Sequence, residues 1–111
     1  FWASWCAPCR EETPIIERLW PEYRARGYTF AGINIQDRER DARAFLDEFR
    51  PSFPMLRDTE NVYLDFGVYG VPESYFFARN LEPRGKLFGP ISEERLRVVL
   101  DALETGPSTG R

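Results

Sequence analysis

Two cysteines stand close together near the start of the chain, and the sequence contains no others. They belong to Cys6-Ala7-Pro8-Cys9, which lies between the apolar stretch Phe1–Ala3 and a segment with helical periodicity. A Cys-x-x-Cys pair at the start of a helix brings its sulfurs together across one turn, and this arrangement is typical of redox-active proteins. The chain is therefore expected to place a β-strand, the two cysteines and a helix in direct succession.

The two sulfurs are expected to have different roles. Cys6 lies where unsatisfied N–H groups and the positive end of the helix dipole stabilise a thiolate. Cys9 lies inside the first turn and is expected to be more buried and to stay protonated. We therefore predict that Cys6 attacks a substrate disulfide and that Cys9 resolves the mixed disulfide. A half zinc site and an incidental structural disulfide are the alternatives, although one cysteine pair supplies too few ligands for structural zinc.

No histidine occurs in the 111 residues, and this excludes several kinds of chemistry. A His-based general base, a Cys-His nucleophile pair and an imidazole metal site are ruled out. The chain has 15 basic and 18 acidic residues and therefore a net charge of −3. Proteins that bind nucleic acid usually have an excess of basic residues, so this composition does not indicate such binding. No apolar run approaches the roughly 20 residues needed to cross a bilayer. With 42% hydrophobic residues, the chain fits one folded domain rather than a disordered segment.

The segment after the cysteines has helical periodicity from about Pro8 to Arg26. Proline is tolerated in a first helical turn, whereas Pro14 lies deeper and is expected to kink the helix. Pro21 is expected to end the regular part early, and Gly27 is expected to cap the C-terminus. The sequence thus predicts a long but irregular first helix.

The rest of the sequence alternates strand-like and helix-like segments. The expected strands are Phe1–Ala3, Tyr28–Ile35, Ser74–Ala78 and Gly85–Phe88, with a short extended piece at Phe53–Leu56 and a short helix or turn at Asp58–Phe66. The further expected helices are Asp41–Phe49 and a last one capped by Ser92 and stopped by Gly106-Pro107. The order β-α-β-α-β-β-α indicates one α/β domain over residues 1–105, and residues 106–111 are expected to form a flexible tail.

Two segments of the sequence resemble a known family. FWASWCAPCREETP is similar to the active-site segment of thioredoxin-fold proteins of the TlpA/ResA/CcmG (DsbE) type. Further along the chain, FGVYGVPESYFF resembles their G-V-Y-G-[AV]-P-E-[ST] segment and is closest to the CcmG/DsbE branch. The hairpin departs from the family pattern, because ARNLEPRGK places Pro83 where the family usually has an Asp-x-x-Gly turn.

The resemblance implies a thioredoxin-like fold and a set of residues around the sulfurs. Pro72 is expected to be a cis-proline packed against the Cys6–Cys9 disulfide, and Val71 to offer its main chain to an extended substrate. Glu73 is expected to tune the thiol pKa or to relay a proton, with a solvated acid at a strand start as the alternative. Trp5 is assigned to substrate binding, with cover over the disulfide as the other interpretation of its ring.

The resemblance also implies an extracytoplasmic thiol–disulfide oxidoreductase that uses no bound cofactor and no metal. Such an enzyme would keep the haem-binding cysteines of apocytochrome c reduced and take electrons from a membrane thiol carrier of the CcdA/DsbD kind. It would be periplasmic and anchored to the membrane by an N-terminal segment. Because the central strand of the fold leads directly into FWASWC, we expect the chain to be an N-terminally truncated part of a longer polypeptide.

Other functions stay open on the sequence alone. Within the enzyme class, the alternative is a general TlpA-type protein-disulfide reductase that acts on other secreted proteins or on copper-site assembly. A peroxiredoxin is disfavoured, because its peroxidatic motif normally surrounds a lone cysteine. Outside the enzyme class, a thioredoxin-like interaction domain or a Cu(I) carrier would use the same two thiols.

Overall fold

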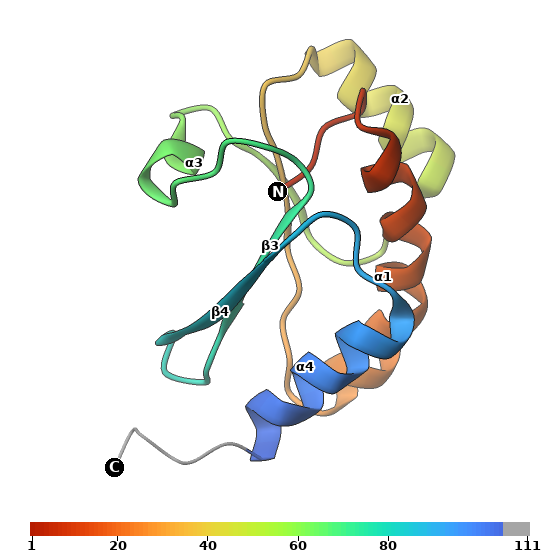
Figure 1. Cartoon of the computed structure of the whole chain (residues 1–111). Helices are drawn as coiled ribbons and strands as arrows, with labels where there is room; N and C mark the ends of the chain where they lie inside the picture. The colour runs from red at the N-terminus through yellow and green to blue at the C-terminus, as the bar shows by residue number, and fades with distance from the viewer. Residues whose placement is uncertain (106–111) are drawn as a thin grey trace.

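The computed structural model describes residues 1–105 (Figure 1), and the tail and the Gly106-Pro107 helix stop expected from the sequence lie outside the described residues. In chain order the elements are α1 (Ala7–Ala25), β1 (Gly32–Asn34), α2 (Glu39–Phe49), β2 (Met55–Arg57), α3 (Val62–Asp65), β3 (Glu73–Phe77), β4 (Pro83–Phe88) and α4 (Glu93–Thr105). The α/β class is confirmed, and the expected short helix or turn is the single helical turn α3.

Residues 1–3 join two pairs of strands. β1 pairs in parallel with β2, and β3 pairs antiparallel with β4. The Trp2 N–H donates to the Ile33 carbonyl at 2.9 Å. On the other side, the Phe1 nitrogen donates to the Glu73 carbonyl at 2.8 Å. The strand order across the described sheet is therefore β2, β1, residues 1–3, β3 and β4, and the cysteines come directly after its middle segment.

The strand β1 is shorter than predicted. Of the expected strand Tyr28–Ile35, only Gly32–Asn34 is confirmed, because a strand needs main-chain partners. β1 finds its partners in β2 and at Trp2, and the first half of the expected strand pairs with no other strand among residues 1–105. There Tyr28 and Phe30 pack against the buried cluster between α1 and α4 instead.

The helix α1 runs through both of its internal prolines, and the prediction that Pro21 ends its regular part early is wrong. Each proline removes one i→i−4 hydrogen bond, but its fixed φ is compatible with a helix. Burial of Leu19 and Tyr23, each with no exposed surface, outweighs this loss. Gly27 caps the helix as predicted, with a left-handed φ of +94° and an N–H that donates to the Arg24 carbonyl at 3.0 Å.

The strands β3 and β4 form the predicted hairpin, but Pro83 does not lie in its turn. The turn is closed by the Leu81 N–H, which donates to the Ala78 carbonyl at 2.8 Å, and Leu81 takes a left-handed φ of +67°. Pro83 is the first residue of β4 and faces Phe77 just after a register shift between Phe76 and Phe77. This place suits proline, because the start of an edge strand or a bulge requires no N–H from it.

The other two long helices follow the predictions closely. α2 begins at Glu39, two residues before the expected Asp41, and buries Phe45. α4 begins after Ser92, whose Oγ accepts a hydrogen bond from the Arg95 N–H at 3.1 Å, so Ser92 is the predicted N-cap. Figure 1 shows α2 beside the start of α1 and α4 alongside its end.

Two clusters of buried side chains form the core of the described chain. The first surrounds the sulfurs at the start of α1 and consists of Trp2, Ala3, Cys6, Cys9, Ala42 and Phe45. The second lies between the end of α1, β3 and α4 and consists of Leu19, Tyr23, Phe76, Ile91, Leu96 and Leu100. The cysteines are therefore part of the hydrophobic core as well as of a helix N-terminus.

Candidate active site

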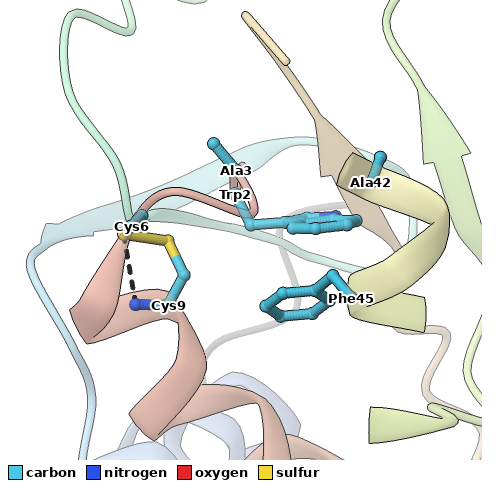
Figure 2. Close-up of a cluster of buried hydrophobic side chains, with 6 residues drawn as sticks. All are labelled: Trp2, Ala3, Cys6, Cys9, Ala42 and Phe45. Carbon is cyan, nitrogen blue, oxygen red and sulfur yellow. Dashed lines mark hydrogen bonds between the residues drawn. A yellow bond between two sulfur atoms is a disulfide. The ribbon is translucent and has the colours of Figure 1, made fainter. Parts of the chain in front are cut away.

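The sulfurs of Cys6 and Cys9 meet at the N-terminus of α1, as the sequence predicts. The two residues form a disulfide, with 5.3 Å between their Cα atoms. Cys6 is the N-cap residue, and its Sγ accepts a hydrogen bond from the Cys9 N–H at 3.1 Å (Figure 2). When the pair is reduced, unsatisfied N–H groups and the helix dipole at this position stabilise a thiolate. This geometry favours Cys6 as the nucleophile.

Burial limits how a partner reaches the two sulfurs. Cys9 is 0% exposed and Cys6 is 4% exposed. Cys9 is therefore the more buried cysteine, as predicted, although the difference is small. Figure 2 shows Trp2 and Phe45 beside the pair, and their ring centroids lie 4.3 Å apart. Because this cluster covers one side of the sulfurs, a partner has to approach from the Cys6 side.

The ring of Trp5 stands at the surface next to Cys6. Its side chain is 62% exposed, and its Nε1–H donates to the Gln36 carbonyl at 2.9 Å. It is not a member of the buried cluster around the sulfurs. A ring this exposed is accessible to a partner protein, and its role in substrate binding stays a prediction.

The Val71–Pro72 peptide bond is cis, as the resemblance implies. Val71 packs against the cluster that contains both cysteines. Pro72 is buried, and its carbonyl accepts a hydrogen bond from the Gly89 N–H at 2.9 Å. Within residues 1–105, the main chain of Val71 makes no hydrogen bond, so it is available to pair with an extended segment. The structure thus brings Val71 to the cluster that contains both cysteines. The role of Val71 in substrate binding and the packing of Pro72 against the disulfide stay predictions.

The carboxylate of Glu73 is buried, and the alternative that it is a solvated acid is wrong. Glu73 is 2% exposed. Its Oε2 accepts a hydrogen bond from the Tyr69 N–H at 3.3 Å, and its Oε1 accepts one from the Tyr75 hydroxyl at 2.9 Å. The carboxylate therefore anchors the loop that precedes the cis-proline. Its role in tuning the thiol pKa or relaying a proton stays a prediction.

Glu12 is a second buried acid, and no local pattern in the sequence distinguishes it from its neighbour Glu11. It is 6% exposed, and its Oε1 accepts a hydrogen bond from the Ile91 N–H at 3.2 Å. Burial raises its pKa to about 7, although the Ile91 N–H acts in the opposite direction. Glu12 lies on α1 three residues after Cys9, a spacing that puts two residues on one helix face. Glu12 therefore shares the helix face of Cys9, and a carboxyl with a pKa of about 7 is only partly ionised at neutral pH.

Known proteins share this architecture. The model of the AhpC/TSA family matches residues 1–82. The thioredoxin-like protein YneN of Bacillus subtilis is 37% identical over 108 residues, which cover 91% of this chain and 61% of YneN. The thiol:disulfide interchange protein DsbE of Pseudomonas fluorescens is 36% identical over 103 residues, which cover 91% of this chain and 56% of DsbE. The chain thus spans less than two thirds of the length of these curated relatives.

A solved structure gives the same picture of the fold. The crystal structure of a thiol:disulfide interchange protein DsbE from Chlorobium tepidum superposes with a TM-score of 0.80 at 30% sequence identity. The match covers 93% of this chain and 76% of that one. The thioredoxin-like fold and the resemblance to the ResA and DsbE proteins are therefore confirmed.

Proposed function

The chain belongs to the AhpC/TSA family, and we propose that its Cys6–Cys9 pair carries out thiol–disulfide exchange with partner proteins. This proposal depends above all on the Cys6 sulfur, which caps α1 and accepts the Cys9 N–H. Both cysteines belong to the cluster against which Val71 of the cis Val71–Pro72 bond packs. The names of the relatives, which include thiol:disulfide interchange proteins, support it.

The exchange proceeds in two steps that conserve electrons. In the reduced protein, the Cys6 thiolate attacks one sulfur of a substrate disulfide, forms a mixed disulfide and releases the other substrate sulfur as a thiolate. Cys9 then loses its proton and attacks the Cys6 sulfur, which closes the Cys6–Cys9 disulfide and releases the second substrate thiolate. Two electrons have passed to the substrate, and two protons complete its thiols. A dithiol that reduces the protein runs the same steps in reverse.

We further infer that the substrate is apocytochrome c, whose haem-binding cysteines the protein would keep reduced. The support is the FGVYGVPESYFF segment, which resembles the CcmG/DsbE branch and which the structure places at the cis-proline. The reduced state would then be restored by a membrane thiol carrier of the CcdA/DsbD kind. A general reduction of disulfides in other secreted proteins uses the same chemistry with a different partner.

The same resemblance supports a location outside the cytoplasm. We infer a periplasmic or extracytoplasmic protein that is anchored to the membrane in its full-length form. No helix among residues 1–105 has the length and hydropathy of a membrane span.

Trapping of the mixed disulfide tests this function. In Cys9→Ser the resolving sulfur is missing, so a partner attacked by Cys6 stays covalently bound and can be identified by mass spectrometry. Cys6→Ser is the matched control and should trap at least tenfold less, because it lacks the predicted nucleophile. Equal trapping by both variants, or by neither, would contradict the proposed exchange. Apocytochrome c among the trapped proteins would support the specific substrate, and its absence beside other trapped proteins would favour the general reductase.

A Cu(I) carrier is distinguished by metal titration. Thiolates are preferred ligands of the soft ion Cu(I), so a carrier would hold it with the Cys6–Cys9 pair. A carrier would lose tight Cu(I) binding in Cys9→Ser and would trap no partner, whereas an oxidoreductase accumulates the mixed disulfide.

A further inference from the structure

The carboxylate of Asp37 binds the turn that carries the cysteines. Asp37 follows β1, and it accepts hydrogen bonds from both donors of Ser4, which is 33 residues away in sequence: the N–H at 2.7 Å and the hydroxyl at 2.8 Å. Ser4 lies in a tight turn that is closed by the Cys6 N–H, which donates to the Ala3 carbonyl at 3.2 Å. One carboxylate therefore holds the centre of the turn that leads into Cys6.

The Asp37 carboxylate is in turn fixed to the sheet. Its Oδ2 accepts a hydrogen bond from the Asn34 Nδ2 at 2.9 Å, and its Oδ1 accepts one from the Arg38 N–H at 3.0 Å. Asn34 belongs to β1 and is 3% exposed. Burial acts to raise the pKa of Asp37, but the hydrogen bonds from Asn34, Ser4 and Arg38 outweigh it and hold the pKa below its usual value. The group is therefore ionised at neutral pH, and its hydrogen bonds are of the stronger, charge-assisted kind.

Gln36, the residue before Asp37, binds Trp5, the residue after Ser4 in the same turn. The Gln36 carbonyl accepts the hydrogen bond from the Trp5 indole, and Gln36 takes a left-handed φ of +48°, which is costly for a residue with a side chain. Ser4 and Trp5 are thus bound by the consecutive residues Gln36 and Asp37. Together these contacts fix the direction in which the chain enters α1.

We propose that Asp37 is a positioning residue for the exchange reaction. By tying Ser4 to the sheet, it fixes the turn that contains Trp5 and Cys6 and aligns the Cys6 sulfur with the N–H groups at the start of α1. Asp37 acts through Ser4 and touches no substrate. The inference rests on the proposed thiol–disulfide exchange, but its first test requires no substrate.

The first test measures the reactivity of the Cys6 thiol in a Cys9→Ser background, as the rate of alkylation by iodoacetamide between pH 5 and pH 9. Asp37→Ala removes both hydrogen bonds to Ser4, so the turn loosens and the thiolate loses part of its N–H stabilisation. Alkylation at pH 7 is expected to slow about three- to tenfold, with the pH profile displaced upward. An unchanged rate would overturn the proposal. A faster rate would overturn it as well, because it would mean that Asp37 acts through its negative charge.

A matched control separates positioning from folding. The Glu17 carboxylate binds Ser52 in the same way, with the N–H at 2.7 Å and the hydroxyl at 2.6 Å, but far from Cys6 along α1. Glu17→Ala removes the same two kinds of hydrogen bond to a serine and should leave alkylation of Cys6 unchanged. If Glu17→Ala slows alkylation equally, the effect is one of general stability and the proposal is wrong.

Two milder variants keep the test decisive if Asp37→Ala does not fold. Asp37→Asn retains one oxygen for the N–H groups of Ser4 and Asn34, and it should alkylate within about twofold of the parent. Ser4→Ala loses only the hydroxyl bond and should slow alkylation about twofold. If Ser4→Ala leaves the rate unchanged while Asp37→Asn slows it about tenfold, Asp37 does not act through Ser4.

A second measurement tests whether Asp37 affects the rate of the proposed exchange reaction. With both cysteines present, Asp37→Ala should lower kcat/KM for reduction of a model disulfide about tenfold, and Glu17→Ala should not change it. If the wild-type protein reduces no disulfide at all, the proposed function fails, whereas the alkylation experiment still decides the role of Asp37.

Discussion

At the scale of single residues, the buried Glu12 makes the stability of the protein depend on pH. Burial raises its pKa from 4.5 to about 7. Between these two values the folded protein binds one more proton than the unfolded chain, whose glutamate is already ionised. The free energy of unfolding therefore falls by about 3 kcal/mol in total as the pH rises through this window. At lower pH, Glu12 is protonated in both the folded and the unfolded state, so it causes no change of stability with pH.

Glu12→Gln is expected to remove this pH dependence. The glutamine keeps an oxygen for the Ile91 N–H but has no proton to lose, so the variant should exceed the wild type in free energy of unfolding by up to about 3 kcal/mol at pH 8 and by much less at pH 5. Urea unfolding of the oxidised protein at both pH values measures the difference. Glu11→Gln, at the exposed neighbouring residue, should behave like the wild type. Parallel pH profiles for Glu12→Gln and the wild type would show that another group titrates.

The residues of the site differ in how far the sequence predicts them. The pairing of Cys6 with Cys9 is local, because a separation of three residues at a helix start brings the sulfurs together whatever the rest of the chain does. Glu12 and Asp37 are defined by distant partners: Ile91 is 79 residues from Glu12, and Ser4 is 33 residues from Asp37. Neither contact produces a periodic pattern or a motif in the sequence, so only the structure identifies these two acids.

At the scale of elements, Glu73 at the start of β3 fixes the loop that carries the Val71–Pro72 bond. Glu73→Ala would leave the Tyr69 N–H without its acceptor, whereas the Tyr75 hydroxyl would keep the Phe66 carbonyl at 3.0 Å. Hydrogen bonds to charged groups contribute about 1.5–3 kcal/mol, so amide hydrogen exchange of the loop between α3 and β3 should accelerate at least about tenfold.

Hydrogen exchange followed by mass spectrometry of the loop peptides measures this effect. Glu60→Ala removes an exposed carboxylate from the preceding loop and should leave the exchange rates near the wild-type values. Equal rates in Glu73→Ala and the wild type would mean that the loop is held by the packing of Val71 rather than by the carboxylate.

The observed helices agree with the predicted ranges where the sequence is amphipathic. The predicted and observed ranges differ where tertiary contacts determine the ends of an element. α2 and α4 have clear apolar stripes, and their observed ranges lie close to the expected ones. Pro21 has a strong local tendency to end a helix, but the buried face of α1 outweighs it. The expected strand from Tyr28 shortens for the opposite reason, because β-propensity alone supplies no hydrogen-bonding partner.

At the scale of the whole molecule, α4 closes the second cluster against α1 and β3. Leu100 is 4% exposed in this cluster, whereas Val98 on the same helix is 61% exposed. Leu100→Ala should lower the free energy of unfolding by about 2–5 kcal/mol, because it leaves a cavity in the core. Val98→Ala is the matched control and should change it by less than about 0.5 kcal/mol.

Urea unfolding followed by both tryptophan fluorescence and far-UV circular dichroism tests this prediction. If the two clusters form one cooperative unit, the two signals change together in Leu100→Ala. The fluorescence comes from Trp2 in the first cluster and also from Trp5 and Trp20. A loss of helical signal before the fluorescence change would instead show that α4 detaches separately from the rest of the molecule.

The burial of Cys6 also determines the kinetics of encounter. A sulfur at a 4% exposed residue can be reached from very few directions, so most collisions with a partner are unproductive. Two proteins that must meet in one orientation associate at about 10⁵–10⁷ M⁻¹s⁻¹, well below the diffusion limit. In the proposed exchange, a partner therefore has to be correctly oriented before the Cys6 thiolate can attack its disulfide. The ring of Trp5, the residue before Cys6, is exposed, and we predict that it contacts such a partner.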